Sequence, residues 1–356
     1  MDSSFWVKQE TVPKNYMWPK EDLVEACEEL NEPLVDLEGF LKGDKVGTQQ
    51  AARIIREACL KHGFFQVINH GVDSRILRAA YDQTEKFFQL PPDVKSRAEK
   101  IPGALCGYAH AHTDRFSSKL PWKETLSFDF HENSQEPVVV NYFRSTFGED
   151  FEQTGLIYQE YSEAMKCLSL EIMELLAISL GVDPHFYRNF FEDSRSTMRC
   201  NYYPICKEAG LTLGTGAHCD PISLTILYQD EMAGLEVFAD NKWMSVRPRP
   251  GALVINIGDT FTALTNGIYK SVLHRAVVNT QKDRLSMAFF VNPRDDKVVT
   301  PPSELLGNQG TRMYPDFTWA DLLRFTQFHY RVDSDTLKNF IEWFQSSKSV
   351  KDPSVH

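Results

Sequence analysis

Residues 216–228 read GAHCDPISLTILY, and this stretch carries the strongest indication of the fold. A His-x-Asp pair, His218 and Asp220, stands directly before an apolar run. Side chains two residues apart point to the same face of a strand, so both should project together. The same face would continue with Ile222, Leu224 and Ile226. A carboxylate on an apolar face is costly without a partner, and a metal ion would provide one.

Short apolar runs separated by turn residues surround this stretch. They lie at 222–228, 235–238, 243–246, 252–257, 271–278 and 285–291. Such spacing is typical of an antiparallel sandwich or barrel. We therefore expect a fold that is mainly β, with flanking helices.

A third metal ligand is available at His274, within the run 271–278. Two imidazoles and one carboxylate on one side of a metal form the facial triad of non-haem iron(II) oxygenases. The open half of the coordination sphere lets a chelating co-substrate and dioxygen bind together. His218, Asp220 and His274 are thus predicted metal and catalytic residues. The alternative for His218 and Asp220 alone is a hydrogen-bonded pair in the core.

A second His-x-Asp pair occurs at His112-Thr113-Asp114. It lies among Gly, Ala and Ser residues, and no strand pattern follows it. We interpret it as a solvated loop.

Arg284 and Ser286 follow His274 and would share one face of the strand that includes the run 285–291. That face continues with Ala288 and Phe290. An arginine fork binds a carboxylate through two parallel hydrogen bonds, and the serine hydroxyl adds a donor. The distal carboxylate of 2-oxoglutarate would satisfy this arginine. A salt bridge to Asp283 or Glu236 is the alternative.

The quartet Asn201-Tyr202-Tyr203-Pro204 precedes the His-x-Asp pair. Its amide and phenol groups can hydrogen-bond a keto acid near the metal, although such a quartet also suits core packing followed by a turn. The fixed order of all four motifs favours one joint site.

Helical periodicity flanks the β region. Residues 1–32 read as an irregular lead-in and 33–37 and 64–68 as strands, with helices expected at 47–62, 73–89, 151–180, 318–329 and 334–346. Thr318 and Ser334 are plausible caps for the last two helices. We divide the chain into an N-terminal part (1–190), a β core (191–300) and C-terminal helices (301–356).

Composition excludes several classes of partner. Lys and Arg total 38 against 49 Asp and Glu, a net charge of −11, so nucleic acid and anionic membrane surfaces are disfavoured. No apolar run is long enough to span a bilayer, and the N-terminus lacks the features of a secretory signal. The seven scattered cysteines indicate reduced thiols. We expect a cytoplasmic protein, and a monomer.

The sequence resembles the plant 2-oxoglutarate- and iron(II)-dependent dioxygenases. HGFFQVINHGV at 62–72 is similar to their N-terminal signature. The resemblance implies a double-stranded β-helix, or jelly-roll, core. It also implies iron ligation by His218, Asp220 and His274, and binding of 2-oxoglutarate by Arg284 and Ser286 with help from Tyr203 and Asn201.

Within that family the sequence resembles the gibberellin 20-oxidases most closely. The stretches that carry this likeness are LPWKETLSF at 120–128, MRCNYYP at 198–204, LGTG at 213–216, NIGDTF at 256–261 and YPDFTW at 314–319. The resemblance implies stepwise oxidation and loss of carbon-20 of gibberellin precursors, diterpenoid acids, with iron(II), 2-oxoglutarate and dioxygen and with ascorbate as activator. The first stretch would form a wall of the substrate site, with candidates Trp122, Lys123, Thr125 and Phe128. An edge strand packed on the barrel is the alternative.

Several positions depart from the family pattern and bear on the choice of substrate. They are Ala217, Met244, Ile268, Val272 and the pair Val291-Asn292. None is a predicted ligand. Arg115, Lys123 and Arg199 are unranked candidates for binding a substrate carboxylate.

Three other functions stay open. They are the same chemistry at position 2 or 3 of gibberellin or on another plant metabolite, a binder that senses a ligand, and a zinc hydrolase built on the same His-Asp-His set. An open iron site argues against a pure binder, and a hydrolase would not need Arg284.

Overall fold

The computed structural model describes residues 10–31, 33–111, 119–132, 136–307, 310–329 and 336–349. The predicted loop His112-Thr113-Asp114, the carboxylate candidate Arg115 and the predicted cap Ser334 lie outside these ranges.

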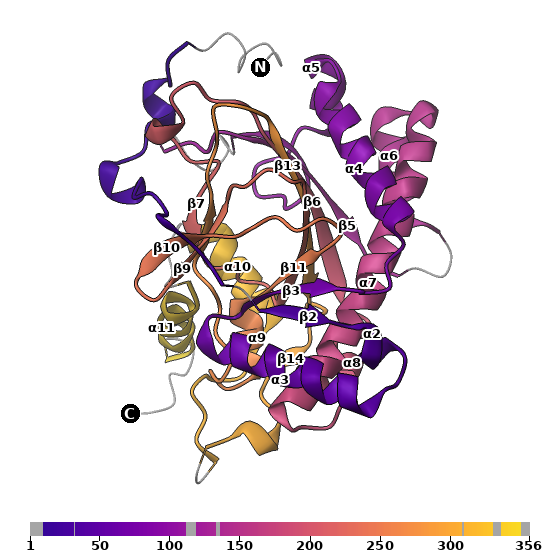
Figure 1. The fold of residues 1–356 in the computed structure, drawn as a ribbon, viewed down its shortest axis with the longest axis vertical. Helices are drawn as coiled ribbons and strands as arrows, with labels where there is room; N and C mark the ends of the chain where they lie inside the picture. Colours follow the sequence, from indigo (N-terminus) through magenta and orange to yellow (C-terminus); the bar gives the residue numbers. More distant parts are fainter. Residues whose placement is uncertain are drawn as a thin grey trace.

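Two β-sheets form the centre of the molecule (Figure 1). The larger has eight strands in the order β2-β3-β11-β8-β13-β6-β5-β4, which are Leu34–Asp36, Phe64–Ile68, Leu253–Ile257, Leu224–Gln229, Arg284–Asn292, Arg195–Tyr203, Glu124–Phe130 and Gly107–His110. The smaller has five in the order β1-β10-β9-β12-β7, which are Glu28–Glu29, Lys242–Ser245, Leu235–Ala239, His274–Ala276 and Thr215–His218. The predicted jelly-roll core with flanking helices is confirmed.

Ten α-helices, several short 3-10 helices and a two-stranded sheet complete the described part of the chain. The helices are α2 (Glu38–Leu41), α3 (Lys45–Lys61), α4 (Ser74–Gln89), α5 (Pro92–Lys95), α6 (Val138–Phe147), α7 (Glu152–Leu180), α8 (His185–Phe191), α9 (Asp259–Leu264), α10 (Trp319–His329) and α11 (Thr336–Ser349). The short strands are β14 (Val298–Val299) and β15 (Phe317–Thr318). No helix in these ranges combines the length and apolarity that crossing a bilayer requires.

Strand β13 shows how the large sheet separates the core from the site. Alternate side chains Leu285, Met287, Phe289 and Val291 join the main apolar core, to which α3, α4, α6 and α7 also contribute. The other face presents Arg284, Ser286, Ala288 and Phe290 to a cavity between the two sheets. The predicted shared face of Arg284 and Ser286 is therefore confirmed.

Helix boundaries follow local chemistry. Asp73 caps α4 by accepting a hydrogen bond from the Arg75 amide. Helix α7 ends at Gly181, whose φ of 77° is readily adopted by glycine. Thr318 caps α10, because its Oγ1 accepts a hydrogen bond from the Asp321 amide. The helices predicted at 47–62, 73–89, 151–180 and 318–329 are confirmed within a few residues, and α11 overlaps the one predicted at 334–346.

The expected continuous face from His218 to Ile226 is wrong. Strand β7 ends at His218 and β8 begins at Leu224, and the chain bends between them around Pro221. The bend changes the alternation, so Ile222, Leu224 and Ile226 enter the core. Thr225 and Leu227 face the cavity with Asp220 instead.

A glycine fixes this bend. The amides of Gly258 and Asp259 donate hydrogen bonds to the carbonyls of Ser223 (3.1 Å) and Asp220 (2.8 Å). A Cβ atom at Gly258 would lie 2.0 Å from the carbonyl oxygen of Ile222. The close approach that positions Asp220 therefore requires glycine at 258.

The N-terminal lead-in follows the smaller sheet. Its strand β1 pairs in parallel with β10, and Arg275 of β12 donates hydrogen bonds to the carbonyls of Asp22 and Val24. Strands β2 to β5 precede residue 190 but belong to the same sheet as β6, β8, β11 and β13. The division at residue 190 stays a prediction.

Candidate metal and co-substrate site

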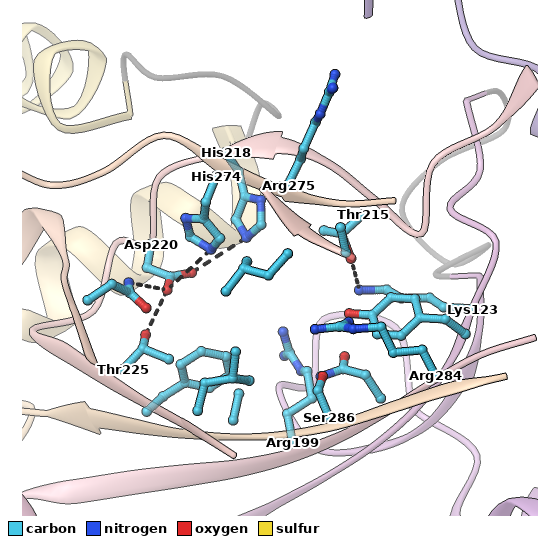
Figure 2. Close-up of a pocket in the computed structure, with 18 of the residues that line it drawn as sticks. Lys123, Arg199, Thr215, His218, Asp220, Thr225, His274, Arg275, Arg284 and Ser286 are labelled. Carbon is cyan, nitrogen blue, oxygen red and sulfur yellow. Dashed lines mark hydrogen bonds and ion pairs between the residues drawn. The ribbon is translucent and has the colours of Figure 1, made fainter. Parts of the chain in front are cut away.

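Three side chains converge at one end of the cavity (Figure 2). His218 ends β7, His274 begins β12, and the two residues are register partners. Asp220 reaches the same point from the bend after β7. The ligand atoms of the three residues lie within 4.8 Å of one another, and the imidazole centroids are 4.3 Å apart.

Backbone contacts set the tautomer of both histidines. The Nδ1 atom of His218 lies 2.8 Å from the carbonyl oxygen of Gly216, and that of His274 lies 3.1 Å from the carbonyl of Val272. Because a carbonyl only accepts, Nδ1 carries the proton in each ring. The Nε2 lone pairs are then free to bind a metal.

Two neighbours orient Asp220. Thr225 and Asn256 donate hydrogen bonds to its Oδ2 at 2.7 and 3.0 Å. Its Oδ1 lies 3.6 Å from Nε2 of His218, and its Oδ2 lies 3.8 Å from Nε2 of His274. The carboxylate therefore presents oxygen between the two imidazoles.

Electrostatics keep these groups in the form that binds metal. Burial, with a contribution from the neighbouring His274, lowers the pKa of His218 to about 4. Burial raises the pKa of Asp220, but the two imidazoles and the hydrogen bonds from Thr225 and Asn256 outweigh it and lower the pKa overall. At neutral pH the site presents a neutral His218 and a carboxylate, the forms that bind divalent metals.

The cavity contains about 620 Å³ of empty space, part of it open to solvent. Arg284 and Ser286 lie at the end away from the triad, on the large sheet (Figure 2). The walls between carry apolar residues from both sheets: Phe64, Leu227, Leu235, Ala276, Ala288 and Phe290.

Arg284 is a buried cation that forms no ion pair with a carboxylate among the described residues, although Asp230 is near enough to feel its charge. One of its terminal nitrogens donates to Oε1 of Gln229 at 2.8 Å, and its guanidinium lies 5.1 Å from the Tyr203 ring centroid. Within the described ranges, its Nε and the Nε2 of Gln229 are buried and have no hydrogen-bond partner. These donors require an acceptor that the protein does not supply there.

The protein partners considered for Arg284 are engaged elsewhere. Glu236 forms a buried ion pair with Arg275 at 2.6 Å. Asp283 accepts hydrogen bonds from the Tyr202 hydroxyl and the Ile205 amide, both at 2.8 Å. The salt-bridge interpretation of Arg284 is therefore wrong.

Ser286, Asn201 and Tyr203 accompany Arg284 on two paired strands. Register pairs Arg284 with Tyr203 and Ser286 with Asn201. The Asn201 amide donates to Oγ of Ser286 at 3.2 Å, and all four residues line the cavity.

The four candidate substrate residues do not lie together at the cavity. Only Lys123 lines the cavity, where its Nζ donates to Oγ1 of Thr215 at 2.9 Å. Trp122 packs edge-on against Tyr16, and Phe128 is buried against α6 and α7. Thr125 is buried in β5. The alternative of an edge strand is wrong, because β5 lies inside the large sheet and β4 forms the edge.

Sequence reasoning missed Thr225 and Asn256, the two residues that orient Asp220. Asn256 could have been recognised from the sequence, because a polar amide within an otherwise apolar buried strand, β11, needs a hydrogen-bond partner. Thr225 becomes evident only once the bend at Pro221 is known.

These residues fit iron(II) and 2-oxoglutarate. Two imidazole nitrogens and one carboxylate oxygen on one side of a point are the donor set of non-haem iron(II) oxygenases. The unsatisfied donors near Arg284 suit the distal carboxylate of the co-substrate.

Comparison with known proteins agrees with this geometry. Residues 194–293 match the family described as the 2OG-Fe(II) oxygenase superfamily, and 33–147 match the N-terminal family of a non-haem dioxygenase in morphine synthesis. The crystal structure of JOX2 in complex with 2OG, Fe and JA is 31% identical, with a TM-score of 0.81 over 94% of this chain and 95% of that one. The fold and the site thus define an iron(II)- and 2-oxoglutarate-dependent oxygenase.

Similarity to individual named proteins assigns the chain to a group within this class of oxygenases. Gibberellin 20 oxidase 2 of Oryza sativa subsp. indica is 56% identical over 93% of this chain and 85% of its own length. Gibberellin 20 oxidase 2 of Arabidopsis thaliana is 54% identical over 94% of this chain and 88% of its own. The chain belongs to the gibberellin 20-oxidase family.

Proposed function

We propose that this protein is a gibberellin 20-oxidase, which oxidises carbon-20 of twenty-carbon gibberellin precursors to give nineteen-carbon gibberellins. The observation that carries the proposal is 56% identity to a rice gibberellin 20 oxidase over 93% of the chain, together with a complete set of candidate ligands.

In this proposal His218, Asp220 and His274 hold the iron through Nε2, a carboxylate oxygen and Nε2. Arg284 and Ser286 bind the distal carboxylate of 2-oxoglutarate, with Tyr203 and Asn201 beside them. When bound, iron(II) and 2-oxoglutarate supply the activation of dioxygen, which side chains alone cannot perform. The apolar walls exclude water and determine which carbon–hydrogen bond lies nearest the metal.

The residues that depart from the family pattern lie outside the cavity lining. Ala217, Met244, Ile268, Val272, Val291 and Asn292 are absent from the cavity lining. Met244 and Val272 pack in an apolar cluster of the smaller sheet instead. The departures therefore change no residue that lines the cavity.

The proposal extends to the setting of the enzyme. We place it in the cytoplasm as a monomer, without a nucleic-acid partner and with ascorbate as activator. None of the seven cysteines is in a disulfide, which suits a reducing compartment.

A product assay tests the function. Purified protein, iron(II), 2-oxoglutarate and ascorbate would be given either a twenty-carbon precursor or a nineteen-carbon gibberellin, with products followed by mass spectrometry. We expect the precursor to advance through alcohol and aldehyde to the nineteen-carbon lactone. Hydroxylation of the nineteen-carbon compound alone would replace this proposal with 2- or 3-oxidation.

A further inference from the structure

The Arg284 side chain is packed against a glycine of the opposite sheet. Gly234 directly precedes β9 of the smaller sheet, whereas Arg284 begins β13 of the large one. A Cβ atom at Gly234 would lie 2.8 Å from Cδ and 3.1 Å from Nε of Arg284. Ordinary contacts between carbon atoms are about 3.5 to 4.0 Å long, so a methyl group at this position would require a displacement of roughly 1 Å.

The turn that carries Gly234 is held on both sides. Oδ2 of Asp230 accepts a hydrogen bond from the Leu285 amide at 2.7 Å, and the Asp230 amide donates to the Leu285 carbonyl at 3.3 Å. The Val277 amide donates to the Gly234 carbonyl at 2.8 Å, and the Val277 carbonyl oxygen would lie 3.0 Å from the added Cβ atom. Because the turn has little freedom to shift, the Arg284 side chain is the part that would have to move.

A second glycine fixes the aromatic neighbour of Arg284. The guanidinium carbon lies 5.1 Å from the Tyr203 ring centroid. Gly214, directly before β7 of the smaller sheet, packs so closely on this ring that a Cβ atom there would lie 2.5 Å from Cδ1 and 2.9 Å from Cε1. A terminal nitrogen of Arg284 also donates to Gln229 at 2.8 Å. The position of the guanidinium is therefore set by contacts with both sheets.

We propose that Gly234, with Gly214 behind Tyr203, sets the position of the Arg284 guanidinium and so makes the protein select a 2-oxo diacid of five carbons. This inference rests on the proposed function, which places the distal carboxylate of 2-oxoglutarate at Arg284. Both glycines are positioning residues that act through the arginine.

The distances involved make the length of the diacid sensitive to these glycines. One carbon more or less changes the reach of a diacid by up to about 1.5 Å, the length of a carbon–carbon bond. That step is close to the displacement of Arg284 that a methyl group at Gly234 would cause. Hydrogen bonds form over a narrow range of about 2.7 to 3.2 Å, so either change removes the match between the guanidinium and the carboxylate.

The test measures binding of 2-oxo acids to the iron(II)-loaded protein by anaerobic calorimetry, without gibberellin. The ligands are oxaloacetate, 2-oxoglutarate and 2-oxoadipate, which differ by one carbon each, and 2-oxovalerate, which lacks the distal carboxylate. We expect the wild type to prefer 2-oxoglutarate over the other diacids by about tenfold or more. Gly234→Ala should weaken 2-oxoglutarate by about 10- to 100-fold, the range for a lost hydrogen bond to a charged group, and remove this preference. Affinity for 2-oxovalerate should not change.

Three further variants separate this effect from general damage to the fold. Gly210→Ala is the matched control, because a Cβ atom there would meet nothing within 4 Å. Gly214→Ala should act in the same direction as Gly234→Ala, through Tyr203. In an Arg284→Ala background, which removes the contacted atoms, Gly234→Ala should have no further effect on the affinity for 2-oxoglutarate.

Three results would overturn the inference. They are a wild type that does not distinguish the three diacids, an unchanged preference in Gly234→Ala, and equal losses of 2-oxoglutarate and 2-oxovalerate in that variant. If Gly234→Ala does not fold, the double variant with Arg284→Ala decides. Folding of the double variant supports a clash at Arg284, and failure of both assigns the glycine to packing on Val277 and rejects the inference. A wild type that binds 2-oxoglutarate but oxidises no gibberellin contradicts the proposed function alone.

Discussion

The two ends of the cavity differ in how far the protein satisfies its own polar groups. At the metal end, the histidine Nδ1 atoms meet backbone carbonyls and Oδ2 of Asp220 accepts two hydrogen bonds. At the other end, Nε of Arg284 and Nε2 of Gln229 are buried and lack a partner within the described residues. One end is a pre-organised ligand set, and the other is a set of donors that requires an anion.

This difference between the two ends indicates which ligand each end binds. A metal site needs fixed directions, and these come from contacts behind the ligands. A carboxylate site needs unsatisfied donors, which remain costly until the anion binds. The cavity is therefore built for a metal and an acid, in agreement with an oxygenase that uses 2-oxoglutarate.

The largest effect is expected from Asp220→Ala, which removes the one carboxylate of the triad. Iron binding and oxidation of the precursor should both fall to background, because two imidazoles alone leave the metal weakly held. Metal content after dialysis and succinate formation measure this. His112→Ala serves as a matched control from the other His-x-Asp pair, and loss of iron there as well would contradict the assignment.

Arg284→Met should give the next largest effect. Losing two charge-assisted hydrogen bonds should raise KM for 2-oxoglutarate by about 100-fold or more. A 2-oxo acid without the distal carboxylate provides the control, since its weak turnover should be the same in both proteins. If the variant also impairs that acid, Arg284 acts on something other than the distal carboxylate.

Asn256→Leu tests the contacts behind the ligands. It removes one of the two hydrogen bonds to Oδ2 of Asp220, and partners of this kind typically affect metal affinity by about 10- to 100-fold. Thr225→Val should act in the same direction. The affinity for iron(II) can be measured by titrating the metal and following the thermal unfolding temperature. Unchanged affinity in both variants would show that Asp220 is oriented by other groups.

The last prediction concerns how the stability of the metal-free protein depends on pH. In the folded chain the pKa of His218 is lowered from 6.5 to about 4. Between these two pH values the unfolded chain therefore binds more protons at this residue than the folded chain does. Stability should thus be complete above about pH 6.5 and decline towards pH 4, by up to roughly 3 kcal/mol. Urea unfolding at several pH values measures it, with metal-free His218→Gln expected to show a shallower slope. An equal slope would assign the effect to other buried histidines, such as His110, whose pKa burial also lowers to about 4.

The sequence predicted features that depend on local alternation. Strand 64–68, the helix at 73–89 and the shared face of Arg284 and Ser286 follow from periodicity within one element. The bend at Pro221 does not, because it depends on the backbone of Gly258 packing from a distant strand end. The placement of Asn201 beside Ser286 likewise depends on the register of β6 against β13, which joins distant segments of the chain.

The most direct test of the two-ended cavity is the affinity for 2-oxoglutarate, measured by anaerobic calorimetry with and without iron(II). The wild type and the variants Asp220→Ala and Arg284→Met would be compared. We predict tight binding only for the wild type with iron(II), with binding weakened by the loss of either end. Affinity that depends on neither the metal nor Arg284 would contradict the assignment of both ends.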